Sequence, residues 1–194
     1  MGWVADDAID READAWLAET VAAARAGSVE AFERLYSALA GRVAGYLRFN
    51  GVVDVDGLTN EVMAEVHRGL SRFEGDAVGF RSWVFTIAHH RMVDDRRRAR
   101  RRPAVVWSSD APEIGAGDVE VEAMDAMADH RLRALLDGLS ADQRDVLMLR
   151  VVADLSLEEA ARSLGKTVGA VKSLQHRALA SLRRLLDEEV RDEL

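Results

Sequence analysis

The stretch LEEAARSLGKTVGAVKSL, residues 157–174, decides the fold of the second half of this chain. Its apolar residues recur at helical spacing on both sides of Gly165, which lies where a tight turn favours a positive φ. Ala161 is small, as the close crossing of two helices demands, and Val171 is placed to fill the space between them. The pattern predicts a helix-turn-helix; an ordinary helical hairpin with a glycine C-cap is the alternative.

Capping signals mark where the helices in this region begin. Ser140 is followed by Gln143, and Ser156 by Glu159, each just ahead of an apolar-periodic run. We therefore predict one helix that starts directly after each serine. Thr167 can cap the helix that follows the turn.

The helix after the turn carries a polar face without acids. Its residues are spaced so that three of them share one side of the helix and two lie beside it: Lys172, Gln175 and His176, with Ser173 and Arg177. All five side chains can bond phosphates or base edges. No Asp or Glu occurs in residues 166–184, although the net charge of the chain is −8. A solvated face of so acidic a protein would be expected to carry acids, so the pattern favours DNA binding.

Composition limits the other classes of function. With 194 residues and 48% hydrophobic residues, the chain can form one ordinary domain or two small ones. The absence of cysteine excludes disulfides, thiolate zinc sites and a cysteine nucleophile. There is no P-loop, nucleophile motif or metal-spaced cluster, so we expect no enzyme activity, no cofactor and no metal site. No apolar run approaches ~18 residues and no signal-peptide core is present, so we expect a cytoplasmic protein without direct membrane insertion.

Helical periodicity is pervasive and strand signals are nearly absent, which predicts an all-α protein. Residues 103–129 contain both prolines of the chain, seven acidic residues and no basic one. We therefore expect two small helical domains, residues 16–102 and 129–194, joined by a flexible acidic linker over 103–128. Residues 1–15 form an N-terminal extension, and residues 51–57, GVVDVDG, form a connecting turn within the first domain. Such a linker would let the two domains move semi-independently.

The first domain ends in the stretch FRSWVFTIAHHRMVDDRRRARRRP, residues 80–103. Phe80, Val84 and Ile87 are spaced as a buried helical stripe, and seven arginines follow in the twelve positions of 91–102. The solvated end of a helix needs far fewer arginines, so this cluster of positive charge requires a binding partner. His89 and His90 make a poor metal site, because adjacent helical residues point about 100° apart.

Three segments, in order, carry a family resemblance: SVEAFERLY, RFEGDAVGFRSWVFTIAHHRMVDDRRRARR, and the run from LDGLSADQRD to LASLRRLL. Together they make the chain similar to the extracytoplasmic-function (ECF) group of bacterial RNA polymerase sigma factors over about residues 20–187. The resemblance implies that the first domain binds the polymerase β′ clamp and opens the −10 promoter element. It implies that the second domain reads the −35 element and docks on the β flap. An anti-sigma factor is a further expected partner.

The resemblance also implies individual site residues. Clamp contacts fall on Asn60 and Glu61, within GLTNE, where Gly57 and Asn60 replace the family's usual acid and Gln. The −35 contacts fall on the five polar residues of the acid-free face. The −10 contacts fall on a stripe that spans roughly 60° of an ideal helix and on the arginines beside it: Trp83, Thr86, His90, Arg91, Arg96, Arg97 and Arg98. Family members often have Asn at the position of His90. The alternative role for Trp83 is a position in the hydrophobic core.

Two other classes of function remain open at this point. A free-standing helix-turn-helix regulator would bind DNA as a dimer, but it would leave residues 1–102 without a role. A regulatory adaptor that binds only protein would not need an acid-free face on its recognition helix.

Overall fold

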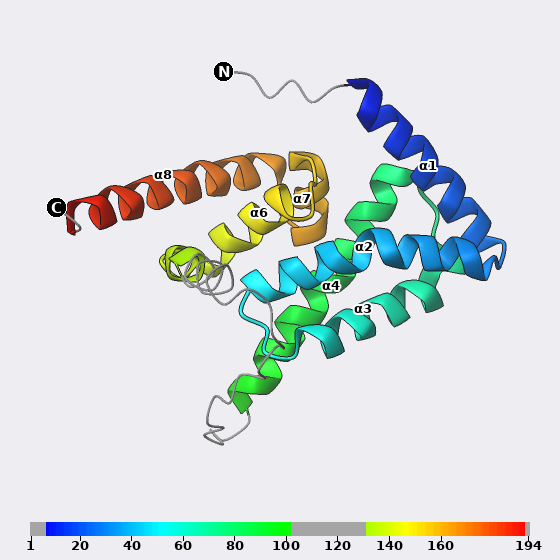
Figure 1. The fold of residues 1–194 in the computed structure, drawn as a ribbon, viewed down its shortest axis with the longest axis horizontal. Helices are drawn as coiled ribbons and strands as arrows, with labels where there is room; N and C mark the ends of the chain where they lie inside the picture. The colour runs from blue at the N-terminus through cyan, green and yellow to red at the C-terminus, as the bar shows by residue number, and fades with distance from the viewer. Residues whose placement is uncertain (1–6, 102–130, 193–194) are drawn as a thin grey trace, which may run out of the picture.

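The computed structural model describes residues 7–101 and 131–192, and the regular structure of this part of the chain is helical, as predicted. The predicted linker lies outside the described residues. Figure 1 shows the two helical groups. The first group comprises α1 (Asp7–Arg25), α2 (Val29–Phe49), α3 (Val55–Gly69), the short 3₁₀ helix η1 (Leu70–Arg72) and α4 (Ala77–Arg101). The second comprises α6 (Ala141–Val151), α7 (Leu157–Leu164) and α8 (Val168–Asp192), preceded by helical residues 131–137.

Side-chain caps set the helix starts in the first domain. The Ser28 hydroxyl accepts a hydrogen bond from the Ala31 amide at 3.1 Å, which starts α2 directly after the turn at residues 26–28. Asp54 accepts from the Gly57 amide at 2.9 Å, so α3 begins at Val55. The sequence had suggested a connecting turn over 51–57. The turn is shorter because the Asp54 carboxylate satisfies a free amide of the first helical turn.

The helix α1 begins at Asp7, inside the stretch that the sequence assigned to an N-terminal extension. Leu17 and Val21 of this helix are buried in the core of the first domain. Asp14 reaches Arg81 of α4 at 2.8 Å. The helix α1 is therefore packed onto the same helix, α4, that carries the predicted −10 residues.

The second domain forms the predicted helix-turn-helix. Both capping boxes are complete, and α6 and α7 start directly after Ser140 and Ser156. Gly165 has a φ of 61° and closes α7 in the left-handed conformation that favours glycine. The Thr167 hydroxyl accepts from the Ala170 amide at 3.2 Å, and Val171 is fully buried between the helices.

The two domains are in contact, with α7 packed against α4 and α6 against the C-terminal half of α2 (Figure 1). The α4–α7 pair is the most extensive helix–helix contact within the described residues. Gly45 of α2 provides one close approach, because a Cβ atom there would lie 2.9 Å from Val152 Cγ1 of the second domain. Ser163 of α7 is buried and donates to the Ser82 carbonyl oxygen of α4 at 3.0 Å.

Candidate nucleic-acid interface

The helix α8 presents the predicted polar face to solvent. The buried side of this helix carries Val171, Leu174 and Ala178. Four of the five predicted −35 residues are exposed and Gln175 is half-buried; the exposed ones are Lys172, Ser173, His176 and Arg177. An outward polar face on the second helix of a helix-turn-helix has the geometry that places side chains in the DNA major groove.

The helix α4 holds the predicted −10 residues in more varied surroundings. His90 is exposed, whereas the Thr86 hydroxyl donates to the Ser82 carbonyl oxygen at 2.7 Å. Trp83 is half-buried and stacks on Phe73 with 5.1 Å between ring centroids. Part of the indole is therefore packed against the protein core. This is the alternative role that the helical spacing of Trp83 allowed.

The four predicted arginines of α4 fall into two pairs. Arg97 and Arg98 are exposed, with Arg97 3.6 Å from Asp94. Arg91 donates through Nε to Glu65 of α3 at 2.6 Å, and this bond raises the pKa of Arg91 above its ordinary value. Arg96 donates to the backbone oxygen of the buried Asn50 at 2.6 Å. Two of the four arginines are therefore exposed to solvent, and the side chains of the other two are hydrogen-bonded to other residues of the first domain.

The predicted clamp residues lie together on an open groove between α2 and α3. Asn60 and Glu61 are both exposed, and the Asn60 side-chain oxygen accepts a hydrogen bond from the Tyr36 hydroxyl at 2.9 Å. Glu61 lies 3.9 Å from Arg91. The groove combines apolar, amide and charged groups, and its lining includes Phe32, Tyr36, Asn60, Glu61, His67 and Arg91. Sequence reasoning did not predict that Tyr36 lies at this groove. The only pattern that involved Tyr36 was its helical spacing to core residues.

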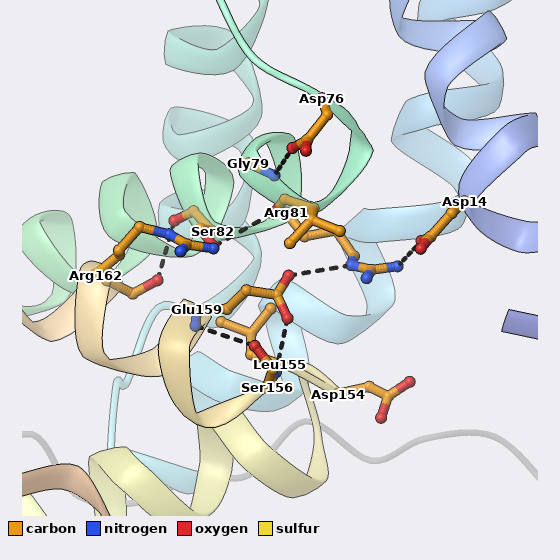
Figure 2. Close-up of polar contacts among 12 residues, drawn as sticks. Asp14, Asp76, Gly79, Arg81, Ser82, Asp154, Leu155, Ser156, Glu159 and Arg162 are labelled. Atoms are coloured by element: carbon orange, nitrogen blue, oxygen red, sulfur yellow. Dashed lines mark hydrogen bonds and ion pairs between the residues drawn. The ribbon is translucent and has the colours of Figure 1, made fainter. Parts of the chain in front are cut away.

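Sequence reasoning also missed a set of charged and polar groups that meet between the domains, of which Ser82 and Glu159 are buried. Figure 2 shows Arg81 of α4 between Asp14 and Glu159, with Nε 3.5 Å from the Glu159 carboxylate. Glu159 also caps its own helix, as its capping-box spacing predicted. The Arg162 guanidinium donates to the Ser82 hydroxyl at 3.4 Å. Nothing in the local spacing of these residues indicates that they meet.

A second buried polar group lies deeper in the same interface. The Tyr46 hydroxyl is hydrogen-bonded to His89 Nδ1 at 3.0 Å, and the same nitrogen lies 3.9 Å from Asp145. Burial, with the positive charges of His90 and Arg96 next in importance, lowers the pKa of His89 to about 4. Burial raises the pKa of Asp145 to about 6. At neutral pH the imidazole is therefore neutral and the carboxylate is charged.

Family models match both domains of this chain. The model for Sigma-70 region 2 matches residues 29–102, and the model for Sigma-70 region 4 matches residues 135–184. A curated ECF RNA polymerase sigma factor is 36% identical to this chain and covers 88% of it. The chain is a member of the ECF sigma factors. The helix-turn-helix and its outward polar face lie within the region 4 match.

Curated relatives agree with the family models. The chain is 36% identical over 178 residues to the ECF RNA polymerase sigma factor SigD of Mycobacterium tuberculosis, a match that covers 88% of this chain and 82% of the relative. It is 33% identical over 179 residues to the ECF RNA polymerase sigma factor BldN of Streptomyces coelicolor, covering 89% and 67%.

A solved structure resembles the chain across both domains. This is the structure of CnrH in complex with the cytosolic domain of CnrY, with a TM-score of 0.68, 26% identity, and coverage of 89% of this chain and 98% of that one. Within the described residues, no helix is long and apolar enough to cross a membrane.

Proposed function

We propose that this sigma factor divides promoter recognition between α4 and α8 while its first domain holds core RNA polymerase. The first domain, residues 16–102, would bind the polymerase β′ clamp through the groove that contains Asn60 and Glu61. The second domain, residues 129–194, would dock on the β flap and read the −35 element. Residues 1–15 and 103–128 serve as the N-terminal extension and the linker.

The observation that carries this proposal is the outward face of α8. Four of its five polar residues are exposed on the second helix of a helix-turn-helix, and no acid interrupts residues 166–184. In a chain with a net charge of −8, such a face concentrates local positive charge where a phosphate backbone would lie. The side chains at its centre can bond base edges as well as phosphates.

The −10 element is assigned to the solvent-facing side of α4. His90, Arg97 and Arg98 are exposed on this helix, and Trp83 is half-buried beside Phe73 and Phe80. Exposed arginines suit the phosphates of a melted strand, and aromatic and hydrogen-bonding groups suit its unstacked bases. Arg91 and Arg96 contribute by fixing α4 on α3 and on the end of α2.

The proposed function needs no chemistry of its own, so the protein acts as a binding factor and not as an enzyme. Its work with polymerase would take place in the cytoplasm. The structural neighbour CnrH is bound by the cytosolic domain of a second protein. By analogy, we propose that an anti-sigma factor binds the present chain and keeps it from polymerase.

In vitro transcription with core polymerase over a genomic template pool tests this function. We expect start sites that appear only when the protein is added, and that share two upstream sequence elements at a fixed separation. Start sites with one shared element, or none that depend on the protein, would contradict the division of labour between α4 and α8. A symmetric element bound without polymerase would indicate a free-standing dimeric regulator instead.

A further inference from the structure

The C-terminal half of α8 carries an apolar stripe that the rest of the described chain leaves partly uncovered. Leu179 and Leu186 are each 42% exposed, and Leu182 between them is half-buried against the core. Their spacing of three and then four residues places the three leucines on one side of the helix. Figure 1 shows α8 extending past α6 and α7 toward its end at Asp192. The stripe is therefore accessible to a partner.

The stripe is separate from the side of α8 that the second domain buries. Leu174 and Ala178 belong to that buried side, and on an ideal helix Ala178 lies about 100° from Leu179. Leu185 is also used within the domain, because a Cβ atom at Gly138 would lie 2.6 Å from Leu185 Cδ1. The core of the second domain therefore does not account for the exposed leucines.

Two unpaired charges of opposite sign lie beside the stripe. On an ideal helix Arg183 and Asp187 lie about 40° and about 80° from Leu179, on the same side of it. Both side chains are exposed, and neither forms an ion pair with another described residue. The adjacent charges, Arg184 and Glu188, differ in both respects: they lie 4.0 Å from each other, and they project from the opposite side of the helix. Arg183 and Asp187 are thus available to a partner that binds the stripe.

The order of charged and apolar groups along the stripe is self-complementary. When a second α8 lies antiparallel to the first, with a two-fold axis at Leu185, Arg183 of each copy lies opposite Asp187 of the other. Leu182 of each copy then lies within one helical turn of Leu186 of the other. A parallel arrangement would instead place like charges opposite each other. The pattern therefore fits an antiparallel, two-fold contact, in which the same surface serves both copies.

We propose that the C-terminal half of α8 is a docking surface for a second copy of this chain, which it binds as an antiparallel dimer over residues 178–192. The overlap is about 22 Å long, so the interface is small and the association is weak and depends on protein concentration. The proposed −35 residues, within 172–177, lie outside the overlap, so the second helix leaves them uncovered. This surface goes beyond the proposed function, in which the protein acts as a single copy.

Two charge reversals give the sharpest test. Arg183→Glu and Asp187→Arg each replace two attractive pairs across the two-fold axis with two repulsive ones, so each variant alone should dimerise about tenfold more weakly. An equal mixture of the two variants should regain the wild-type affinity, because the charges of one variant complement those of the other. Arg184→Glu is the matched control, since it makes the same charge change one residue along, on the opposite side of the helix.

Glutamine substitutions test the apolar part of the contact separately. Glutamine has nearly the helix propensity of leucine, so Leu186→Gln should leave α8 intact. Leu186 lies next to the two-fold axis and contributes from both copies, so this variant should dimerise about tenfold more weakly. Leu179 lies at the edge of the overlap, so Leu179→Gln should have a smaller effect. Arg184→Gln is the control for both variants.

Sedimentation equilibrium of the full-length protein measures the association without DNA or polymerase. We expect the wild type to pass from monomer to dimer with a dissociation constant of roughly 10–100 µM, as suits so small an interface. The Arg184 controls should match the wild type. The single charge reversals and Leu186→Gln should remain mainly monomeric over that range, and the mixture of Arg183→Glu with Asp187→Arg should form the mixed dimer.

Three results would overturn this proposal. One is a wild-type protein that stays monomeric throughout the range. Another is a dimer that neither the charge reversals nor Leu186→Gln weakens, which would mean that a different surface joins the copies. The third is a monomer in which Leu186→Gln lowers the affinity for core polymerase, which would assign the stripe to the β flap. Failure of the protein to direct transcription would contradict the proposed function and leave the sedimentation result unchanged.

Discussion

The two helices assigned to DNA, α8 and α4, have equal length but very different surroundings. The helix α8 has one buried side and one polar side, and its predicted DNA residues lie on the polar side. The helix α4 contacts α1, α2, α3 and α7. Some of its polar side chains are therefore used inside the protein. The role of an arginine on α8 can be inferred from its position on the helix alone. The role of an arginine on α4 can be inferred only from the residues that it contacts.

The largest expected effect on DNA binding is on the α8 side of this comparison. Replacing Lys172 or Arg177 with Ala should weaken binding to the −35 element by about 1–3 kcal/mol where the side chain makes a bidentate base contact. Binding of polymerase holoenzyme to promoter variants measures the loss. A base contact weakens the native element selectively, while a phosphate contact weakens all sequences alike. Arg184→Ala, an exposed arginine two turns farther along α8, is the control. Unchanged binding in both variants would mean that another face of α8 meets the DNA.

The arginines of α4 should separate into a structural class and a DNA-binding class. Arg96→Ala removes a charged hydrogen bond to the Asn50 backbone oxygen, so it should lower the free energy of unfolding by about 1.5–3 kcal/mol. Urea unfolding of the full-length protein measures this change. Arg98 is exposed, so Arg98→Ala should leave stability nearly unchanged.

Arg98→Ala should act on DNA binding instead. Loss of one phosphate contact reduces the slope of log K against log salt by about 0.7–0.9, the smaller figure applying to a single strand. A salt titration of holoenzyme on a pre-melted promoter measures this slope. Equal effects of Arg96→Ala and Arg98→Ala on both stability and the salt slope would remove the distinction between the two classes.

The smallest expected effect is the response of the interdomain contact to a fall in pH. It is small because two groups in this contact respond to pH in opposite directions. The pKa of His89 is lowered to about 4 from 6.5, so a fall in pH from 7 to 5 favours separated domains, in which the imidazole can take up a proton. The pKa of Asp145 is raised to about 6 from 3.8, so the same fall favours domains in contact, where the carboxyl group takes up a proton more readily. The charged groups that act on this pair come from α4, α6 and the turn after α7: His90, Arg96, Asp142, Arg144 and Lys166.

Single substitutions should expose the two opposing responses. The chain has no cysteine, so Val53→Cys and Ala180→Cys, at exposed positions in different domains, allow a dye to be attached to each domain. Energy transfer between these dyes should fall on acidification in Asp145→Asn, where only His89 titrates. It should rise in His89→Asn, where only Asp145 titrates, and change least in the wild type. The same response in both variants would show that other groups control the contact.

Local patterns in the sequence predicted the parts of the structure that depend on neighbouring residues. Ser140, Ser156 and Gly165 act within one helical turn of themselves, and all three have the predicted roles. The α8 face was predictable for the same reason, since helical spacing alone decides which residues share a side. The start of α3 was misplaced because the Asp54 cap within 51–57 was overlooked.

The interdomain contact could not be predicted in this way. Gly45 and Val152 are more than a hundred positions apart, and Glu159 had a sufficient local role as a helix cap. The partners of Arg91 and Arg96 are likewise distant in sequence, which is why these two had been assigned to DNA together with Arg97 and Arg98. Contacts between residues far apart in the sequence produce no periodic pattern. The charge and size of a residue therefore do not reveal which part of the protein it contacts.

The most direct test of the division of labour between α4 and α8 is a promoter-binding titration with and without core polymerase at fixed salt. The isolated protein should bind promoter duplex weakly, because its net charge is −8 and each of its two basic surfaces alone would contact few phosphates. Core polymerase should convert this into tight, sequence-specific binding that requires both elements. Tight, sequence-specific binding by the isolated protein would contradict the account and favour a free-standing helix-turn-helix regulator.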